Sequence, residues 1–239
     1  MTNVERMLAL LRNPSPLNEG MDVRDGLIQR YPHKKKVAII GAFPSRAGAP
    51  LDDPEWEVWC CNQLYGACKD SKGRFRASRW FELHPLTQPP QSDFDLIGIQ
   101  ACPVPVYTLE HTPYFPMSVA FPIEAIVGTL YNARDYFTNT FSYQISLALV
   151  EGFQEIALYG IELTGGREYL LERPCVEYWV GYAQGRGVKV TIGEESALCW
   201  TPFRYGYFYE QEREFGLAIM RQHDGYYSLD GMLPSEKRR

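Results

Sequence analysis

The segment KVAIIGAFPSRAG, residues 36–48, decides the fold of this chain. Val37 to Ile40 is an uninterrupted apolar run rich in β-branched residues, which is the pattern of a strand buried on both faces. Gly41 ends the run, Pro44 fixes one backbone dihedral angle, and Ser45 supplies a hydroxyl. Open α/β sheets bind their ligands outside the carboxyl ends of such strands. The segment therefore predicts a buried first strand that leads into a ligand-binding loop, with an ordinary tight turn as the alternative.

Strand-like and helix-like segments alternate after this point. We expect strands at 55–61, 79–83, 104–109, 155–159 and 188–192, and helices at 122–130, 143–150 and 172–184. The alternation is typical of a Rossmann-like α/β fold, a doubly wound, mostly parallel sheet with helices on both faces. Pro105 indicates an edge position for its strand. The loop 111–122, rich in Pro and aromatic residues, is long enough to be a lid or a substrate loop.

Three parts of the chain differ in pattern. We assign 1–35 to an N-terminal peripheral segment, 36–200 to a Rossmann-like nucleotide-binding domain, and 201–239 to a C-terminal helical tail. Short helices are expected within 4–11 and 205–222. The basic run at 33–36 indicates a solvated strand entry, with a phosphate or nucleic-acid contact as the minority alternative.

The composition is that of a soluble globular protein, with 239 residues, 45% hydrophobic and 22% charged. The net charge of −5 gives no global reason to expect nucleic-acid binding, although a local basic groove would escape this count. No apolar run approaches the roughly 18 residues of a membrane span. The six cysteines form no CxxC pair, which predicts reduced, mostly buried thiols in a cytoplasmic protein. The four histidines are scattered without ligand spacing, so no metal site is predicted.

Polar side chains follow four of the predicted strands. They are Ser45 and Arg46, Asn62 and Gln63, Glu82 and His84, and Glu162. Because parallel strands end at one edge of a sheet, we expect these groups to converge on a single crevice.

Glu82 and His84 are the candidate catalytic residues. They lie two positions apart in a predicted strand end, so both point to the same face, where a carboxylate can orient an imidazole for proton transfer. The alternative is a pair that only hydrogen-bonds the adjacent loop.

Two further segments are candidates for contact with an anion. Thr140 and Ser142 lie at a predicted helix N-terminus, which is a natural anion-binding position, although an ordinary N-cap by one of them is an equally good explanation.

The second segment is GGREYLLERPCVEY at 165–178. It carries the candidate phosphate or substrate contacts Glu168, Tyr169, Arg173 and Glu177. Arg173 can clamp a phosphate bidentately, and a solvated helix start with internal ion pairs is the alternative. The motifs GxGxxG, GxxxxGK[ST], HExxH and GxSxG are absent, which disfavours standard dinucleotide or P-loop chemistry.

Three motifs in a fixed order resemble bacterial sialyltransferases that use CMP-sialic acid. They are GAFPS at 41–45, NQLY at 62–65 and TNTFSYQISLALVEGFQEIALYGIE at 138–162. The order is also similar to the motility-accessory-factor group, which includes archaeal pterin pyrophosphokinases. With FELH at 81–84 and ERPCVEYWVGYAQGRGV at 172–188, the set further resembles bacteriophage proteins of unassigned function.

The resemblance implies a Rossmann-like domain that holds a nucleotide at the strand ends and transfers a sugar or a pyrophosphate. On the sialyltransferase pattern, Ser45 and Asn62 would lie by the nucleotide phosphate and ribose, and the Thr140 region by the donor. That family normally carries Asn and Gly where this chain has Ala42 and Phe43.

The base of the sialyltransferases is a histidine downstream of the last motif. This chain has no histidine between Glu162 and Gln222. Sialyl transfer itself is therefore open, and the base would be His84 or a carboxylate such as Glu82.

We therefore expect a nucleotide-binding transferase of glycosyltransferase type with a CMP- or UDP-type nucleotide-linked donor. Arg173 would neutralise the leaving phosphate. The expected nucleotide-binding residues are Gly41, Pro44, Ser45, Arg46, Asn62, Thr140, Ser142 and Glu162.

Two alternatives stay open. One is an ATP- and Mg²⁺-dependent pyrophosphokinase, with Glu162, Asp52 and Asp53 as metal ligands. The other is a non-catalytic phage protein that binds or sequesters a nucleotide. The acceptor is expected to be a small molecule or a glycan, a nucleic-acid acceptor and a homo-oligomer are left open, and a phage-encoded chain would act in the host cytoplasm.

Overall fold

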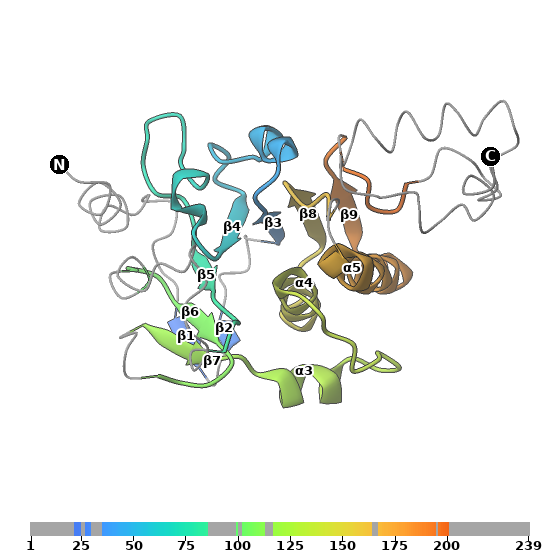
Figure 1. The fold of residues 1–239 in the computed structure, drawn as a ribbon. Coiled ribbons are helices and arrows are strands. Elements are labelled where there is room, and N and C mark those ends of the chain that lie inside the picture. The colour runs from blue at the N-terminus through green and yellow to red at the C-terminus, as the bar shows by residue number, and fades with distance from the viewer. Residues whose placement is uncertain are drawn as a thin grey trace, which may run out of the picture.

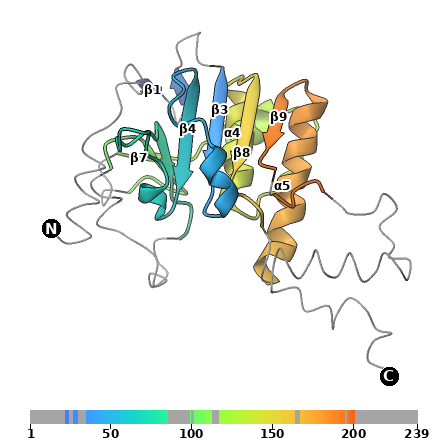
Figure 2. The same ribbon diagram turned by 90° about the horizontal axis from the view of Figure 1, so that it is seen from above.

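The computed structural model describes residues 22–24, 27–29, 35–85, 99, 102–112, 117–163, 167–194 and 196–200. Its centre is a seven-stranded sheet with the strand order β7-β6-β5-β4-β3-β8-β9, in which every pair of neighbours is parallel. The strands are β3 (Lys36–Ile40), β4 (Trp56–Cys61), β5 (Arg79–Phe81), β6 (Val106–Thr108), β7 (Ser118–Ala120), β8 (Glu155–Tyr159) and β9 (Lys189–Ile192). Figure 2 shows β4, β3, β8 and β9 side by side, with their arrowheads toward one edge. The predicted Rossmann-like α/β fold is confirmed.

The strand order places β3 inside the sheet, next to its central strand β4. Val37 to Ile40 are fully buried, because β4 flanks the strand on one side and β8 on the other. The chain first builds outward from β3 to β7 and then crosses back to form β8. The change of direction makes a topological switch point between β3 and β8, and α/β sheets of this kind bind their ligands at such a point.

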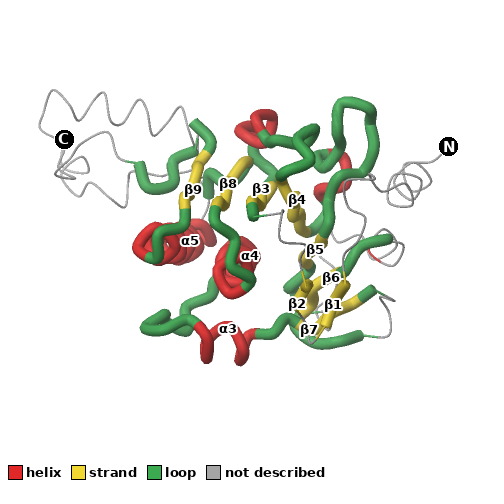
Figure 3. Tube along the Cα trace, turned by 180° about the vertical axis from the view of Figure 1, so that it is seen from behind, coloured by secondary structure: helices red, strands yellow, loops and turns green. Residues whose placement is uncertain are grey.

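The long helices of the described residues pack on one face of the sheet. They are α3 (Ile123–Thr129), α4 (Thr140–Val150) and α5 (Arg167–Gly185). Figures 1 and 3 show all three on the same side, with α4 beneath the central strands. The core on this side joins sheet residues such as Ile39 and Trp59 to Leu147 of α4 and Trp179 of α5.

The opposite face is covered by shorter elements. The 3-10 helices η2 (Pro44–Gly48) and η3 (Leu64–Gly66) lie in the connections that follow β3 and β4. Apolar side chains of the loops, including Phe75 and Val104, complete a second core over Ile40 and Trp80. None of the helices among the described residues has both the length and the apolar character needed to span a bilayer.

Several element boundaries differ from the sequence prediction. Pro105 precedes β6 rather than marking an edge, because β7 pairs with the far side of β6. Strand β7 lies within the segment 111–122, which was predicted to be a loop. Helix α5 begins at Arg167, five residues before its predicted start, and accommodates Pro174 inside its length. An antiparallel pair, β1 (Asp22–Arg24) and β2 (Leu27–Gln29), was not expected from the sequence.

The cysteines correct one prediction. Cys60 and Cys68 form a disulfide, so the expectation of reduced thiols is wrong for this pair. The physical reason is that the chain reverses through η3 and brings Cys68 back beside β4. Cys61, Cys102 and Cys175 are buried free thiols, and Cys199 is an exposed one.

Some predictions fall outside the described residues. They are the helices expected within 4–11 and 205–222 and the first half of the basic run 33–36. The division of the chain at 35 and 200 stays a prediction.

Candidate functional site

The strands β5, β4, β3 and β8 are neighbours and all end at the same edge of the sheet, which we call the carboxyl edge. The polar groups predicted to converge follow these four strands in that order: the Glu82–His84 pair, Asn62, Ser45 and Glu162. Neighbouring strands lie about 4.8 Å apart, so the row from β5 to β8 extends over roughly 14 Å. The four groups thus follow neighbouring strands in a row along one edge, and their convergence on a single crevice stays a prediction.

The switch point between β3 and β8 is closed by the backbone. The Gly41 N–H donates to Tyr159 O at 2.7 Å, and the Phe43 N–H donates to Gly160 O at 3.1 Å. A Cβ atom on Gly41 would lie 2.1 Å from Gly160 O. Glycine is required at position 41 because the backbone segments that follow β3 and β8 approach each other too closely for a side chain.

Ser45 and Glu162 meet at this junction. The Ser45 N–H donates to Glu162 Oε1 at 3.2 Å, and Ser45 Oγ accepts from the Gly160 N–H at 2.7 Å. Glu162 is 6% exposed, and none of the described residues donates to its second oxygen, Oε2. A buried carboxylate oxygen without a donor is costly, which makes it suited to accept a hydroxyl or an amine of a ligand.

Asn62 follows β4 in the left-handed region, with a φ of 51°. Its N–H donates to Phe81 O at 3.1 Å, and its main-chain oxygen accepts from Trp80 Nε1 at 2.9 Å. The side-chain oxygen Oδ1 is buried, and it has no hydrogen-bond partner within the described part of the chain. Asn62 therefore offers a second acceptor along the carboxyl edge.

Glu82 and His84 form the pair expected after β5. Glu82 Oε1 lies 2.5 Å from His84 Nδ1 and 3.3 Å from the His84 main-chain nitrogen, which donates to it. The Glu82 side chain is 1% exposed and the His84 side chain 53% exposed. Burial and the charge of Glu82 raise the pKa of the Cys61 thiol, which therefore stays protonated. A buried carboxylate that fixes a solvent-facing imidazole is a suitable arrangement for proton transfer.

The N-terminus of α4 is capped, but by a different residue than predicted. Asn139 Oδ1 accepts from the Ser142 N–H at 3.0 Å, and Ser142 Oγ donates to Asn139 O. Ser142 is fully buried. Its hydroxyl thus serves the cap, whereas Thr140 is the partly exposed first residue of the helix.

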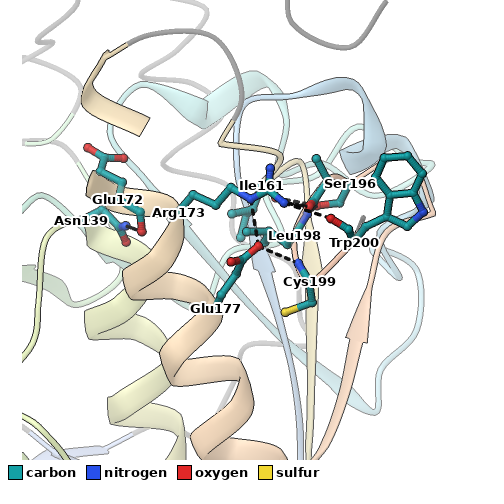
Figure 4. Close-up of polar contacts among 10 residues, drawn as sticks. Asn139, Ile161, Glu172, Arg173, Glu177, Ser196, Leu198, Cys199 and Trp200 are labelled. Atoms are coloured by element: carbon teal, nitrogen blue, oxygen red, sulfur yellow. Dashed lines mark hydrogen bonds and ion pairs between the residues drawn. The ribbon is translucent and has the colours of Figure 1, made fainter. Parts of the chain in front are cut away.

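Arg173 is held by the protein itself. Its Nε donates to Glu177 Oε1 at 2.8 Å, and its Nη2 donates to the carbonyl oxygens of Ala197 and Trp200. Figure 4 shows this group, in which the Cys199 N–H also donates to Glu177. The arrangement agrees with the alternative of internal ion pairs, and it fastens residues 196–200 to α5. Glu168 and Tyr169 lie in the first turn of α5, and their side chains are outside the described residues.

The carboxylates proposed for Mg²⁺ do not come together. Asp53 O accepts from the Trp56 N–H at the start of β4, and Asp52 binds Ser71. They therefore lie toward the amino end of β4, while Glu162 lies at the carboxyl edge. Throughout the described ranges no three His, Cys, Asp or Glu residues are grouped so that they could hold a metal ion.

Gln144 is a polar residue that the sequence analysis missed. It lies in the second turn of α4 and is fully buried. Neither its Oε1 nor its Nε2 meets a hydrogen-bond partner in the parts of the chain that the structure covers. Its neighbours Ser142 and Ser146 are also polar, so nothing in the sequence marks this amide as buried.

No family model matches the chain, and no curated protein matches it. Among solved structures, the Campylobacter jejuni sialyltransferase CstII in complex with cytidine-5'-monophosphate is 18% identical, covering 66% of this chain and 79% of that one with a TM-score of 0.43. The monofunctional α-2,3-sialyltransferase Cst-I of the same organism is 14% identical, covering 75% and 81% with a TM-score of 0.47. Folds of this class carry many reactions, so the function of this chain has to be inferred from its own residues.

Proposed function

We propose that this chain is a nucleotide-binding transferase of glycosyltransferase type, with a CMP- or UDP-linked sugar as its donor. The observation that carries the proposal is the Glu82–His84 pair, whose buried carboxylate lies 2.5 Å from the imidazole of an exposed histidine. The pair shares the carboxyl edge with the acceptor atoms of Asn62 and Glu162.

The donor nucleotide would lie along the carboxyl edge. Glu162 Oε2 and Asn62 Oδ1 are buried acceptors that follow strands two positions apart, roughly 10 Å along the row; Glu162 would accept from a ribose hydroxyl, and Asn62 from a different hydroxyl or amine of the donor. The row of roughly 14 Å from β8 to β5 suits an extended donor, with its nucleoside near Glu162 and its sugar near His84.

The transfer step requires a base at the acceptor. His84 would take the proton of an acceptor hydroxyl, and the resulting oxygen nucleophile would form a new C–O bond to the donor sugar. The bond from that sugar to the phosphate breaks, and the electron pair leaves with the nucleotide. Glu82 would stabilise the imidazolium that forms.

The leaving phosphate requires a positive partner. Arg173 is occupied with Glu177 and the carbonyls of residues 197 and 200. Arg46 is better placed, because it lies in η2, in the connection that follows β3, and its Nη1 makes a long contact of 3.5 Å to Phe43 O. We therefore assign the phosphate to Arg46 in place of Arg173.

Calorimetric titration with CMP, UDP and GDP, followed by turnover assays with the corresponding sugar donors, tests the proposal. We expect His84→Ala to lower kcat by about 10²- to 10⁴-fold with little change in nucleotide affinity. His111→Ala is the matched control, because that histidine contacts Ser118 at the start of β7. Absence of binding by any nucleotide would overturn the proposal, and tight binding without turnover of any donor would favour the sequestering function.

A further inference from the structure

The main-chain N–H and C=O of Asn62 both form hydrogen bonds with residues of β5. Its N–H donates to Phe81 O at 3.1 Å, and its C=O accepts from the indole Nε1 of Trp80 at 2.9 Å. These two bonds come from consecutive residues of the neighbouring strand. They hold Asn62 at the φ of 51° that ends β4.

This conformation determines where the Asn62 side chain goes. Side chains alternate along a strand, so a regular continuation of β4 would direct residue 62 to the same face as Cys60, into the core that contains Trp80. The left-handed turn breaks the alternation and presents the main-chain carbonyl to the indole instead. Asparagine tolerates the turn at low cost, and its Oδ1 has no hydrogen-bond partner among the described residues.

Trp80 itself is fixed with little freedom. It is fully buried, its ring lies 5.9 Å from that of Phe75, and its main-chain N–H donates to Pro105 O. The indole donor therefore occupies one position relative to β4. A rigid donor of this kind can hold a turn in a single conformation, as a supporting layer does around a functional side chain.

We infer that Trp80 is a positioning residue of the candidate site, whose indole N–H orients the Asn62 amide toward the ligand. The inference rests on the proposed function for the identity of the ligand, a nucleotide. Trp80 does not touch the ligand and acts only through the main chain of Asn62.

The test compares two buried tryptophans whose indole N–H groups donate to different main-chain carbonyls. Trp80→Phe removes the donor and keeps an aromatic ring. Trp179→Phe is the matched control, because Trp179 is equally buried and its Nε1 donates to Tyr136 O at 2.7 Å, away from β4. We expect both variants to lose thermal stability to a similar extent, and only Trp80→Phe to weaken binding of CMP or UDP, by about three- to tenfold.

Repeating Trp80→Phe in the Asn62→Gly variant distinguishes an effect on the orientation of Asn62 from a general loss of structure. Gly adopts the left-handed conformation without help but carries no amide, so Asn62→Gly removes the group that Trp80 is inferred to orient. Trp80→Phe should therefore cost no further affinity in the Asn62→Gly background. An equal loss in both backgrounds would overturn the inference.

The crystal structure of Trp80→Phe gives a readout that needs no nucleotide. We expect residue 62 to leave the left-handed region in this variant and to keep it in Trp179→Phe. If the wild-type protein binds neither CMP nor UDP, the proposed function fails. The backbone conformation of residue 62 in the two variants still tests whether Trp80 positions Asn62. Retention of the φ of Asn62 without the indole donor would refute it.

Discussion

Ser45 and Glu162 lie 117 positions apart in the chain and are joined at the switch point by a hydrogen bond of 3.2 Å from the Ser45 N–H to Glu162 Oε1. The Ser45 hydroxyl accepts in turn from the Gly160 N–H. The first bond anchors the carboxylate through Oε1, the second fixes the Ser45 loop against β8, and the other carboxylate oxygen, Oε2, has no donor among the described residues. A carboxylate that is half anchored and half unsatisfied is a preorganised acceptor.

Glu162→Gln tests this carboxylate. We expect nucleotide affinity to fall about 10- to 100-fold, because a charge-assisted hydrogen bond to a ribose hydroxyl becomes a neutral one. Stability should change little, since the amide oxygen can still accept from Ser45. Titration calorimetry gives the affinity.

The control for this variant is Glu155→Gln in the same strand, where the carboxylate pairs with Lys189 at the other end of β8. Its affinity should match that of the wild type. Equal affinities for both variants would remove Glu162 from the binding site.

Gly41→Ala tests the closure of the switch point. The added Cβ would lie 2.1 Å from Gly160 O, a backbone atom that cannot move aside, and we expect a loss of about 3 kcal/mol or more in the free energy of unfolding. Gly181→Ala in α5 is the matched substitution, because nothing lies within 4 Å of its added Cβ. It should stabilise the protein by roughly 0.5–1 kcal/mol. Urea denaturation of the two variants checks both signs, and a tolerated Gly41→Ala would contradict the geometry.

The central strands could be predicted from the sequence because their apolar runs are continuous. Val37 to Ile40 and 155–159 are buried on both faces and form β3 and β8. In contrast, β7 contains only three residues, and its strand conformation depends on pairing with β6. A strand that exists through its partner leaves no periodic signal, and the edge assigned to Pro105 was wrong for the same reason.

The row of polar groups at the carboxyl edge follows from parallel topology, so it could be predicted without coordinates. The hydrogen bonds that individual side chains form could not be predicted in this way. The bonds of Arg173 go to carbonyl oxygens 24 and 27 positions away, and a carbonyl oxygen carries no sequence signal. The cap of α4 by Asn139 and the unsatisfied amide of Gln144 are equally invisible, because each depends on backbone geometry.

Gln144→Met tests whether the buried amide costs stability. Removal of two polar atoms that meet no partner in the described structure should raise the free energy of unfolding by about 1–2 kcal/mol, because methionine fills a similar volume without the desolvation penalty. Gln154→Met, at an exposed position next to β8, should bring no such gain. Chemical denaturation measures both. A less stable Gln144→Met would mean that the amide is satisfied by a bound water or ligand.

Differential alkylation tests the cysteine pairing. In the native protein, iodoacetamide should label Cys199 first, since it is the exposed free thiol. The reaction should be slow at pH 7 and faster at pH 9, because burial and the neighbouring Glu177 raise the Cys199 pKa. Unfolding without reductant should expose the four free thiols, and reductant should release Cys60 and Cys68. Mass spectrometry counts the labels, and six labels before reduction would disprove the disulfide.

Alkaline pH should destabilise the protein through Tyr107. Burial raises the pKa of this phenol to about 12, whereas the unfolded chain titrates near 10. Between these values the folded state binds more protons than the unfolded state, so stability falls as the pH rises, by about 1.4 kcal/mol at pH 11. Tyr107→Phe removes this contribution and should flatten the fall by that amount. Urea denaturation of both proteins from pH 8 to 11 measures the difference, and parallel curves would show that the Tyr107 phenol titrates alike in the folded and unfolded states.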